Sequence, residues 1–248
     1  MFLNFSQLRI GAGGFKPHEL YQQHRNGKKV EIMFKRCFDL IFSGIGLIVL
    51  GPIFLILGIV IKHESPGPVF YRGVRVGRYG KAFKIFKFRS MVVDAEKKGA
   101  ATTSDKDDRV TKVGRIIRKF KFDEFSQLIN VFLGDMSIVG PRPQVQWAVD
   151  TFTKEQLKVL ELRPGITDWA SIKFHNEGEI IEKSGISDAD EAYMLLIHPE
   201  KMRLQLEYFY NNNLWIDLKI LYATMTKLFA TRVTSHNGDS QGEGPQPI

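Results

Sequence analysis

The chain has 248 residues, 44% of them hydrophobic, which is enough apolar material for one sizeable domain and excludes a largely disordered protein. Its 35 Lys and Arg outnumber 27 Asp and Glu, so the net charge of +8 favours anionic partners such as phospholipid headgroups, nucleotides or nucleic acid without choosing among them. The single cysteine, Cys37, excludes an internal disulfide framework and a cysteine-based zinc cluster, and it fits a reducing cytosol.

Residues 1–30 show no sustained hydrophobic period, and residues 1–34 are interpreted as an N-terminal extension. The segment 35–62 contains an uncharged apolar run from Leu40 to Ile61, which as a straight helix would reach about 33 Å and cross a bilayer. Its depth in the chain and its length argue against a cleaved signal peptide, and a buried helix of a soluble core is the less favoured alternative.

Both flanks of this run are rich in lysine and arginine, and such flanks tend to stay on the cytoplasmic side of a membrane. Gly51-Pro52 lies in the middle of the run, where proline removes a backbone donor and favours a kink. We therefore expect a re-entrant helix-break-helix that enters and leaves by the cytoplasmic face. A kinked spanning helix is the alternative.

Residues 63–231 are expected to form one catalytic domain of mainly helical α+β class. Strand-forming residues at Val69–Val76 and Phe83–Phe88 surround Tyr79-Gly80 and predict a small hairpin. The polar segment 97–108 has the composition of a mobile loop, and the tail 232–248 that of a disordered segment.

Several helices are predicted from their apolar spacing. A cationic amphipathic helix carries Val113, Ile116, Ile117 and Phe120, and it lies either in the membrane interface or with its stripe on an ordinary core. Further helices are expected at 123–133, 154–162, 200–210 and 214–229, and the apolar stripe of the last leaves room for a homodimer.

Asp123-Glu124 follows a run of cations and begins an apolar helical stretch. At a helix start the macrodipole and unpaired amides favour an ionised carboxylate and can hold a phosphate, so an aspartate there is a competent nucleophile. An acidic pair in a first helical turn is also an ordinary cap. Downstream, Pro141 and Pro143 bracket Arg142, and a rigidly presented guanidinium suits a phosphate, although a surface salt bridge is the simpler interpretation of an arginine taken alone.

Ordered motifs along the chain, taken together, are much more specific than any one of them. They read Lys35-Arg36-x-Phe38-Asp39-Leu40, Ser65-Pro66-Gly67-Pro68-Val69-Phe70, Lys84-Ile85-Phe86-Lys87-Phe88-Arg89-Ser90-Met91, Asp108-Arg109-Val110-Thr111-x-x-Gly114-Arg115, Asp123-Glu124-x-x-Gln127-Leu128-x-Asn130-Val131, Gly134-Asp135-Met136-Ser137-x-Val139-Gly140-Pro141-Arg142-Pro143 and Arg163-Pro164-Gly165-Ile166-Thr167. From about residue 35 to 225 the chain resembles the bacterial sugar transferase family, the monotopic polyprenyl-phosphate phosphoglycosyl transferases, in a form without the additional membrane helices of larger relatives.

The resemblance implies that a sugar phosphate is moved from a UDP-sugar to polyprenyl phosphate with release of UMP, at the cytoplasmic face of the bacterial inner membrane. It implies that Asp123 is the nucleophile of a covalent phosphosugar intermediate, and that Glu124 helps to bind Mg²⁺, with Asp123, or to handle protons. The remaining residues expected at the substrates are Lys87, Arg89, Arg118, Arg142, His175 and Asp217.

Three positions depart from the family pattern. Gly51 stands where a serine usually precedes the membrane-helix proline, Asp168 replaces a glycine, and His175 replaces an arginine that binds phosphate. Histidine is only partly charged near neutral pH, so phosphate binding at position 175 is in doubt.

Two further functions are weighed against the transferase. A membrane-anchored basic domain that binds anionic lipid or nucleic acid would use the same cations and aromatics but would not need Asp123. Because the acidic pair favours the transferase, we expect anionic membrane lipid as a partner and no nucleic acid. A diphosphate hydrolase would use similar groups and differ in its products. The sequence leaves the sugar and the glycan pathway open.

Overall fold

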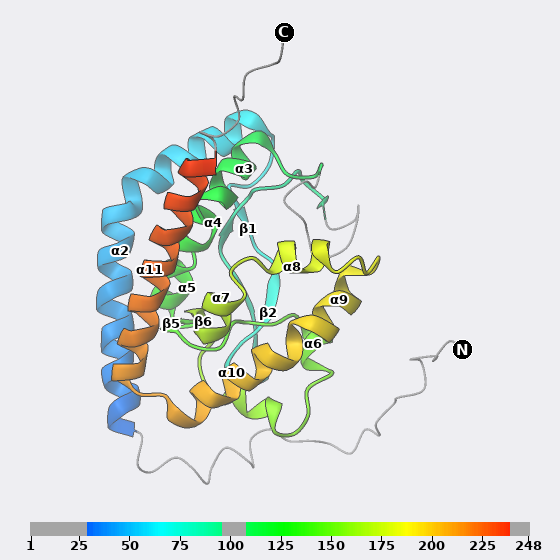
Figure 1. Ribbon diagram of the computed structural model, residues 1–248. Helices are drawn as coiled ribbons and strands as arrows, with labels where there is room; N and C mark the ends of the chain where they lie inside the picture. Colours follow the sequence, from blue (N-terminus) through cyan, green and yellow to red (C-terminus); the bar gives the residue numbers. More distant parts are fainter. Residues whose placement is uncertain (1–28, 96–107, 239–248) are drawn as a thin grey trace.

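The computed structural model describes residues 29–95 and 108–238, which are drawn in colour in Figure 1. The predictions made for residues 1–28, 97–107 and 239–248 lie outside the described residues. The described part is mainly helical, with three small two-stranded sheets, so the predicted α+β class is confirmed.

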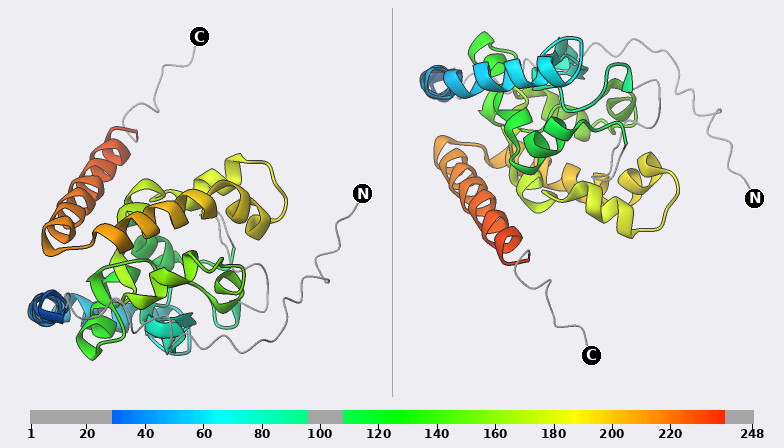
Figure 2. Two further views of the ribbon diagram at one scale, coloured as in Figure 1. Left: turned by 90° about the horizontal axis from the view of Figure 1, so that it is seen from below. Right: turned by 90° about the horizontal axis from the view of Figure 1, so that it is seen from above.

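The long helix α2 (Lys29–Glu64) contains the apolar run. It stays helical through Pro52, so the predicted break is instead a bend within one helix, whose two halves run in different directions in Figures 1 and 2. A proline lacks the backbone N–H of its turn and bends a helix without ending it. The helix begins at Lys29, before the segment 35–62 that was predicted from the sequence. By length and composition α2 is able to cross a membrane, and only 6% of its most apolar stretch is buried.

The predicted hairpin is confirmed as two short ladders. The strand β1 (Phe70–Tyr71) pairs antiparallel with β4 (Lys87–Phe88), and β2 (Val74–Val76) pairs antiparallel with β3 (Ala82–Lys84). The 3-10 turn η2 (Arg78–Gly80) joins β2 to β3. Tyr79 and Gly80 both adopt positive φ there, 58° and 73°, which allows the sharp reversal.

The cationic helix α3 (Lys112–Lys119) has Thr111 as its N-cap residue, and the Thr111 side chain accepts a hydrogen bond from the Gly114 N–H. Its predicted apolar stripe divides between two environments, because Ile117 is fully buried and Ile116 is 57% exposed. The helix predicted at 123–133 consists of α4 (Phe122–Phe125) and α5 (Leu128–Leu133), and it ends at Gly134, whose φ of 99° favours glycine.

The second half of the chain contains elements that the sequence did not predict. Strand β5 (Ser137–Val139) pairs in parallel with β6 (Gly165–Thr167), and the helix α7 (Trp169–Lys173) lies beside this pair in Figure 1. The other unpredicted helices are α6 (Gln146–Val149), α8 (Glu177–Lys183) and α9 (Ala189–Leu196). The predicted helix at 154–162 is the 3-10 helix η4 (Gln156–Glu161).

The predicted helices at 200–210 and 214–229 are confirmed as α10 (His198–Asn211) and α11 (Leu214–Gly238). The helix α11 reaches Gly238 and so includes residues 232–238 of the predicted tail. A helix that is already nucleated is extended one residue at a time at little cost, even by polar residues. Most of the predicted stripe of α11 is exposed: Leu214, Leu218 and Met225 are 41–51% exposed, while Ile220 on another face is buried.

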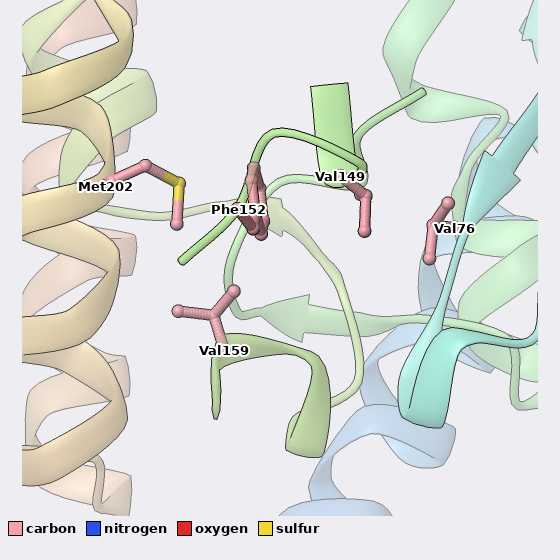
Figure 3. Packing of buried hydrophobic residues seen from close by; sticks show 5 residues of the cluster. All are labelled: Val76, Val149, Phe152, Val159 and Met202. Carbon is pink, nitrogen blue, oxygen red and sulfur yellow. The ribbon is translucent and has the colours of Figure 1, made fainter. Parts of the chain in front are cut away.

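The apolar core is divided into several clusters. Figure 3 shows one of them, in which Met202 of α10 and Val159 of η4 meet Phe152, Val149 and Val76. A second joins Ile61 of α2 with Phe88 of β4 and Ile117 of α3. The second cluster packs the C-terminal half of α2 against β4, α3 and the start of α4, and α4 carries the acidic pair.

The first half of α2 is tied to the domain by polar contacts. The Arg36 guanidinium donates to the carbonyls of Val131 (2.7 Å) and Phe132 (3.1 Å) at the C-terminal end of α5. The buried Asp39 accepts hydrogen bonds from Ser137 Oγ (3.0 Å) and Ile138 N (2.9 Å). The long helix is therefore part of the domain as well as an apolar segment.

Candidate active site

The acidic pair lies in the first turn of α4, where Lys121 takes a left-handed conformation (φ 56°) and turns the chain from α3 into α4. This reversal places Asp123 inward with only 6% of its surface exposed, while the Glu124 side chain is 29% exposed. A buried carboxylate requires cations or donors nearby to offset its desolvation.

Lys87 supplies one such cation, and the α4–α5 segment positions it. Asn130 accepts from Phe86 N (2.7 Å) and donates to Lys84 O (3.0 Å), and Ser126 Oγ donates to Phe86 O (3.1 Å). These bonds fix Lys84 and Phe86, which closely precede Lys87 in the chain, against the α4–α5 segment.

The Lys87 ammonium bridges the two carboxylates. Its Nζ lies 3.1 Å from Asp123 Oδ2 and 3.5 Å from Glu124 Oε1. Burial alone would lower the pKa of Lys87, but Asp123 and Glu124 outweigh it, so the pKa is raised and the lysine stays charged.

Arg142 holds Glu124 from the other side. Its Nη2 lies 2.9 Å from Glu124 Oε1, and Nη1 donates to Gln127 Oε1 (3.3 Å) and to the Ile166 carbonyl. Burial raises the pKa of Glu124, but Arg142, Lys87 and Lys121 outweigh that effect and lower the pKa to about 2. Glu124 is therefore an anion at neutral pH.

The backbone of Arg142 is held as well as its side chain. Asp168 Oδ2 accepts from Arg142 N (3.2 Å) and from Gln205 Nε2 (2.9 Å), while Oδ1 accepts from the N–H and hydroxyl of Ser171, each at 2.6 Å. Asp168, which is 1% exposed, thus caps α7 and links the Arg142 loop to α10. It does so at a position where the family usually has glycine.

One oxygen of the acidic pair has no partner among the described residues. Asp123 Oδ1 is buried and accepts no hydrogen bond, a state that costs about 1–3 kcal/mol. Mg²⁺ is commonly held by one or two carboxylates together with substrate phosphates and waters, so Asp123 and Glu124 fit such an ion. No group of three or more potential metal-ligating side chains occurs in the described residues.

The other predicted site residues lie in different surroundings. Arg89 is buried, and its guanidinium donates to the carbonyls of Pro66 and Ser65 (2.7 Å each) at the end of α2. Arg118 donates from Nε to Ser90 Oγ (3.0 Å), and Asp217 accepts from Tyr208 Oη (2.6 Å) and pairs with Lys35. Neither Arg89 nor Asp217 contacts the acidic pair through a described hydrogen bond or ion pair.

His175 follows α7 and has its Nδ1 buried without a hydrogen-bond partner. Burial first, and then Lys227 and Lys121, lower its pKa. The imidazole is therefore largely neutral at pH 7, unlike the arginine usual at this position.

Sequence reasoning assigned no role to Gln127, Asn130 or Asp168, although each contacts Arg142 or the strand of Lys87. Gln127 and Asn130 belong to the motif that begins at Asp123, at three- and four-residue helical spacing, so this spacing was the available signal. The bonds of Asp168 join segments distant in sequence, which no local pattern indicates.

An acidic pair held between a lysine and an arginine, on a domain whose long helix is apolar enough for a bilayer, defines a class of phosphate-handling proteins associated with membranes. Residues 30–231 match the bacterial sugar transferase family, and the chain belongs to that family.

Curated relatives agree with this assignment. The UDP-N-acetylgalactosamine-undecaprenyl-phosphate N-acetylgalactosaminephosphotransferase of Aeromonas hydrophila is 37% identical over 77% of this chain and 42% of its own length. The UDP-glucose:undecaprenyl-phosphate glucose-1-phosphate transferase of Escherichia coli is 34% identical over 82% of this chain and also 42% of its own. An uncharacterized sugar transferase of Bacillus subtilis is 34% identical over 81% of this chain and 89% of its own. The chain thus spans about two fifths of the length of the first two relatives.

Proposed function

We propose that this protein transfers a sugar 1-phosphate from a UDP-sugar to undecaprenyl phosphate and releases UMP, as the first membrane step of bacterial surface glycan assembly. The observation that carries the proposal is the cluster in which Lys87 contacts the carboxylates of both Asp123 and Glu124 and Arg142 contacts that of Glu124. The relatives' names supply the two substrates. Phosphoryl transfer depends on positively charged groups held in place, such as Lys87 and Arg142, because the negative charge of the diphosphate must be offset.

The chemistry proceeds in two displacements. The Asp123 carboxylate attacks the sugar-linked phosphorus, an oxygen–phosphorus bond forms, and the bond to the bridging diphosphate oxygen breaks with UMP as the leaving group. An oxygen of undecaprenyl phosphate then attacks the same phosphorus, the aspartyl–phosphate bond breaks, and undecaprenyl diphosphate sugar leaves with Asp123 restored. Lys87 and Arg142 offer donors to the phosphoryl oxygens during both displacements.

Mg²⁺ would be held by Asp123 and Glu124, and the unpaired Asp123 Oδ1 supports this assignment. Bound there, the ion would supply Lewis-acid stabilisation of diphosphate charge. Glu124, whose pKa is lowered to about 2 by its cationic neighbours, stays ionised and able to hold a cation at every physiological pH.

We further propose that α2 enters and leaves the inner membrane by its cytoplasmic face, with the domain on that face. The bend at a proline-containing centre and the cations at both flanks support this arrangement. A Cys37→Ser chain with a single cysteine at Lys28→Cys or Lys81→Cys tests it. Both cysteines should resist an impermeant maleimide in intact spheroplasts and react after lysis. Reaction of either one in intact spheroplasts would show that α2 spans the bilayer.

The function is tested with the full chain in nanodiscs, Mg²⁺, undecaprenyl phosphate and a panel of UDP-sugars, with UMP as the readout. Asp123→Asn should reduce turnover by at least about a thousandfold while near-normal circular dichroism is retained, because an amide is a poor nucleophile. Asp150→Asn, which changes an exposed aspartate on another helix end, is the control.

Three outcomes would contradict parts of the proposal. Full activity of Asp123→Asn would remove the nucleophile assignment. Acceptor-independent release of UMP together with free sugar phosphate would indicate a hydrolase. Failure to trap a hydroxylamine-sensitive phosphosugar adduct on Asp123 in the absence of acceptor would exclude the covalent intermediate.

A further inference from the structure

An open apolar groove of about 740 Å³ lies between the second half of α2 and β1. Phe54 and Gly58 of α2 form one wall, Val69 and Phe70 form the other, and Lys62 and His63 stand at one end. None of the residues that hold the acidic pair lines it. Its volume is within the range of about 300–1,000 Å³ that is usual for small-molecule sites.

The groove combines apolar walls with basic side chains at one end, which is the chemistry of a site for a long hydrocarbon with an anionic headgroup. Two further side chains that line it are exposed: Leu55 is 67% exposed and Ile59 is 61% exposed. With α2 in the membrane as proposed above, this exposed apolar surface would face hydrocarbon.

The groove shares its aromatic wall with the acidic site. The ring of Phe54 lies 5.2 Å from that of Phe88, and the ring of Phe70 lies 5.0 Å from it. Phe88 directly follows Lys87 in β4, and Phe122, which directly precedes Asp123, packs on the same cluster. A chain in the groove would therefore lie against the residues that support Lys87 and Asp123.

From this continuity we infer that the groove binds the isoprenoid chain of the polyprenyl phosphate acceptor, with the phosphate on the side of Lys62 and His63. The inference rests on the proposed function. A bulk phospholipid has the same general chemistry, but the shared aromatic wall favours the molecule that must reach Asp123.

Filling the groove tests this assignment kinetically. A Cβ built on Gly58 meets Val69 Cγ1 at 3.5 Å, an ordinary contact, so Gly58→Phe accommodates its first atom and extends its ring into the groove. Ile48→Phe, at a position of α2 that is 79% exposed and outside the groove, is the matched control.

Gly58→Phe should raise KM for undecaprenyl phosphate by about tenfold, since displacing a few buried methyl or methylene groups costs about that factor. KM for the UDP-sugar, and turnover of a short-chain isoprenyl phosphate that leaves the groove unfilled, should stay as in the wild type. A KM for undecaprenyl phosphate equal to that of Ile48→Phe would overturn the inference while leaving the transferase function intact.

A second measurement needs neither a variant nor turnover. Undecaprenyl phosphate with a photoactivatable diazirine on its chain should label the peptides 54–59 or 69–70 of the wild-type protein in phosphatidylcholine nanodiscs. Unlabelled undecaprenyl phosphate should prevent the labelling, and phosphatidylglycerol at the same concentration should not. Labelling without any UMP release would support the groove and refute the proposed function. The inference would be overturned if phosphatidylglycerol prevented the labelling as well as unlabelled undecaprenyl phosphate does, or if these peptides were not labelled.

Discussion

At the scale of single residues, Glu124 is the carboxyl group of the site whose protonation is most strongly controlled. Burial alone would raise its pKa, but Arg142, Lys87 and Lys121 lower it to about 2. Its ordinary value is 4.5, so the folded protein holds Glu124 ionised over a range in which the unfolded chain is protonated. A carboxyl group with a lowered pKa stabilises the fold above its unfolded value, and this contribution is lost as the pH falls toward the folded value.

The corresponding prediction concerns acid stability. Between about pH 5 and pH 2 the wild type should lose about 1–3 kcal/mol more stability than Glu124→Gln, because the variant lacks this linkage. Thermal unfolding followed by circular dichroism across that range provides the comparison. Identical pH profiles for the two proteins would show that the ion pairs with Arg142 and Lys87 do not contribute to stability.

Asp168 is expected to position Arg142 rather than to contact substrate. Asp168→Ala should lower the unfolding free energy by about 2–4 kcal/mol, because several donors lose their acceptor in a buried place. The rate of UMP release should also fall. Asp168→Asn should recover part of the unfolding free energy and part of the rate, because its side-chain carbonyl can still cap α7. Thermal unfolding and kcat measured on the same preparations separate the two effects. An unchanged kcat in a folded Asp168→Ala protein would refute the positioning role.

The family resemblance predicted Asp123, Glu124, Lys87 and Arg142 at one site, and the structure brings these four side chains together, while their roles stay predictions. The sequence was not sufficient to place Arg89. The donors of a guanidinium satisfy a phosphate or a row of carbonyls equally well, and only the tertiary fold places Arg89 against the end of α2. The same holds for Asp217, whose partners come from α2 and α10.

At the scale of elements, local patterns were most reliable where a helix has both an apolar period and a cap. The end of α5 at Gly134 was predicted correctly for that reason. The reversal at Tyr79-Gly80 was predicted from the strand-forming residues on both sides of a glycine. The short helices α7, α8 and α9 were missed, because five to eight residues span too few turns to show a period. The parallel pair of β5 and β6 joins segments far apart in sequence and has no local signal at all.

Gly114 gives a test at this scale in which packing and helix propensity oppose each other. It lies within α3, where alanine is the better helix former by about 1 kcal/mol. A Cβ there would lie 1.9 Å from the Ser90 carbonyl oxygen, so Gly114→Ala should destabilise the protein by about 1–3 kcal/mol or more.

Gly51→Ala in α2 is the matched control, because a Cβ at that position meets nothing within 4 Å. Its stability should equal or slightly exceed that of the wild type. Chemical or thermal unfolding compares the two variants. Equal stability of Gly114→Ala and Gly51→Ala would show that α3 moves away from Ser90 without cost.

At the scale of the whole molecule, α11 closes the structure against the beginning of α2. Asp217 is 1% exposed, pairs with Lys35 of α2 and accepts a hydrogen bond from Tyr208 of α10. Burial, together with Asp217, raises the pKa of Tyr208, which therefore remains a donor at all working pH values. The exposed Leu214, Leu218 and Met225 lie elsewhere on α11, and homodimerisation through them remains a prediction.

Removing the Asp217 carboxylate should loosen the contact between these three helices. Asp217→Ala is expected to cost about 2–4 kcal/mol of unfolding free energy, because it leaves Lys35 without its buried counter-charge. Lys173→Gln breaks the exposed pair with Glu200 and should cost less than about 1 kcal/mol. Thermal unfolding in the same detergent measures both. Equal costs for the two variants would show that the Asp217 contact is no more stabilising than a surface ion pair.

The attachment of α2 at both of its halves has a practical consequence for producing the protein. Arg36 and Asp39 hold α5 and β5 at one half, while Ile61 lies in the cluster with Phe88 and Ile117 at the other. A truncated chain that started after Glu64 would expose this cluster and leave the last carbonyls of α5 without the Arg36 donor. The apolar helix is thus not a detachable anchor, and a water-soluble fragment obtained by deleting it should aggregate instead of yielding an active domain.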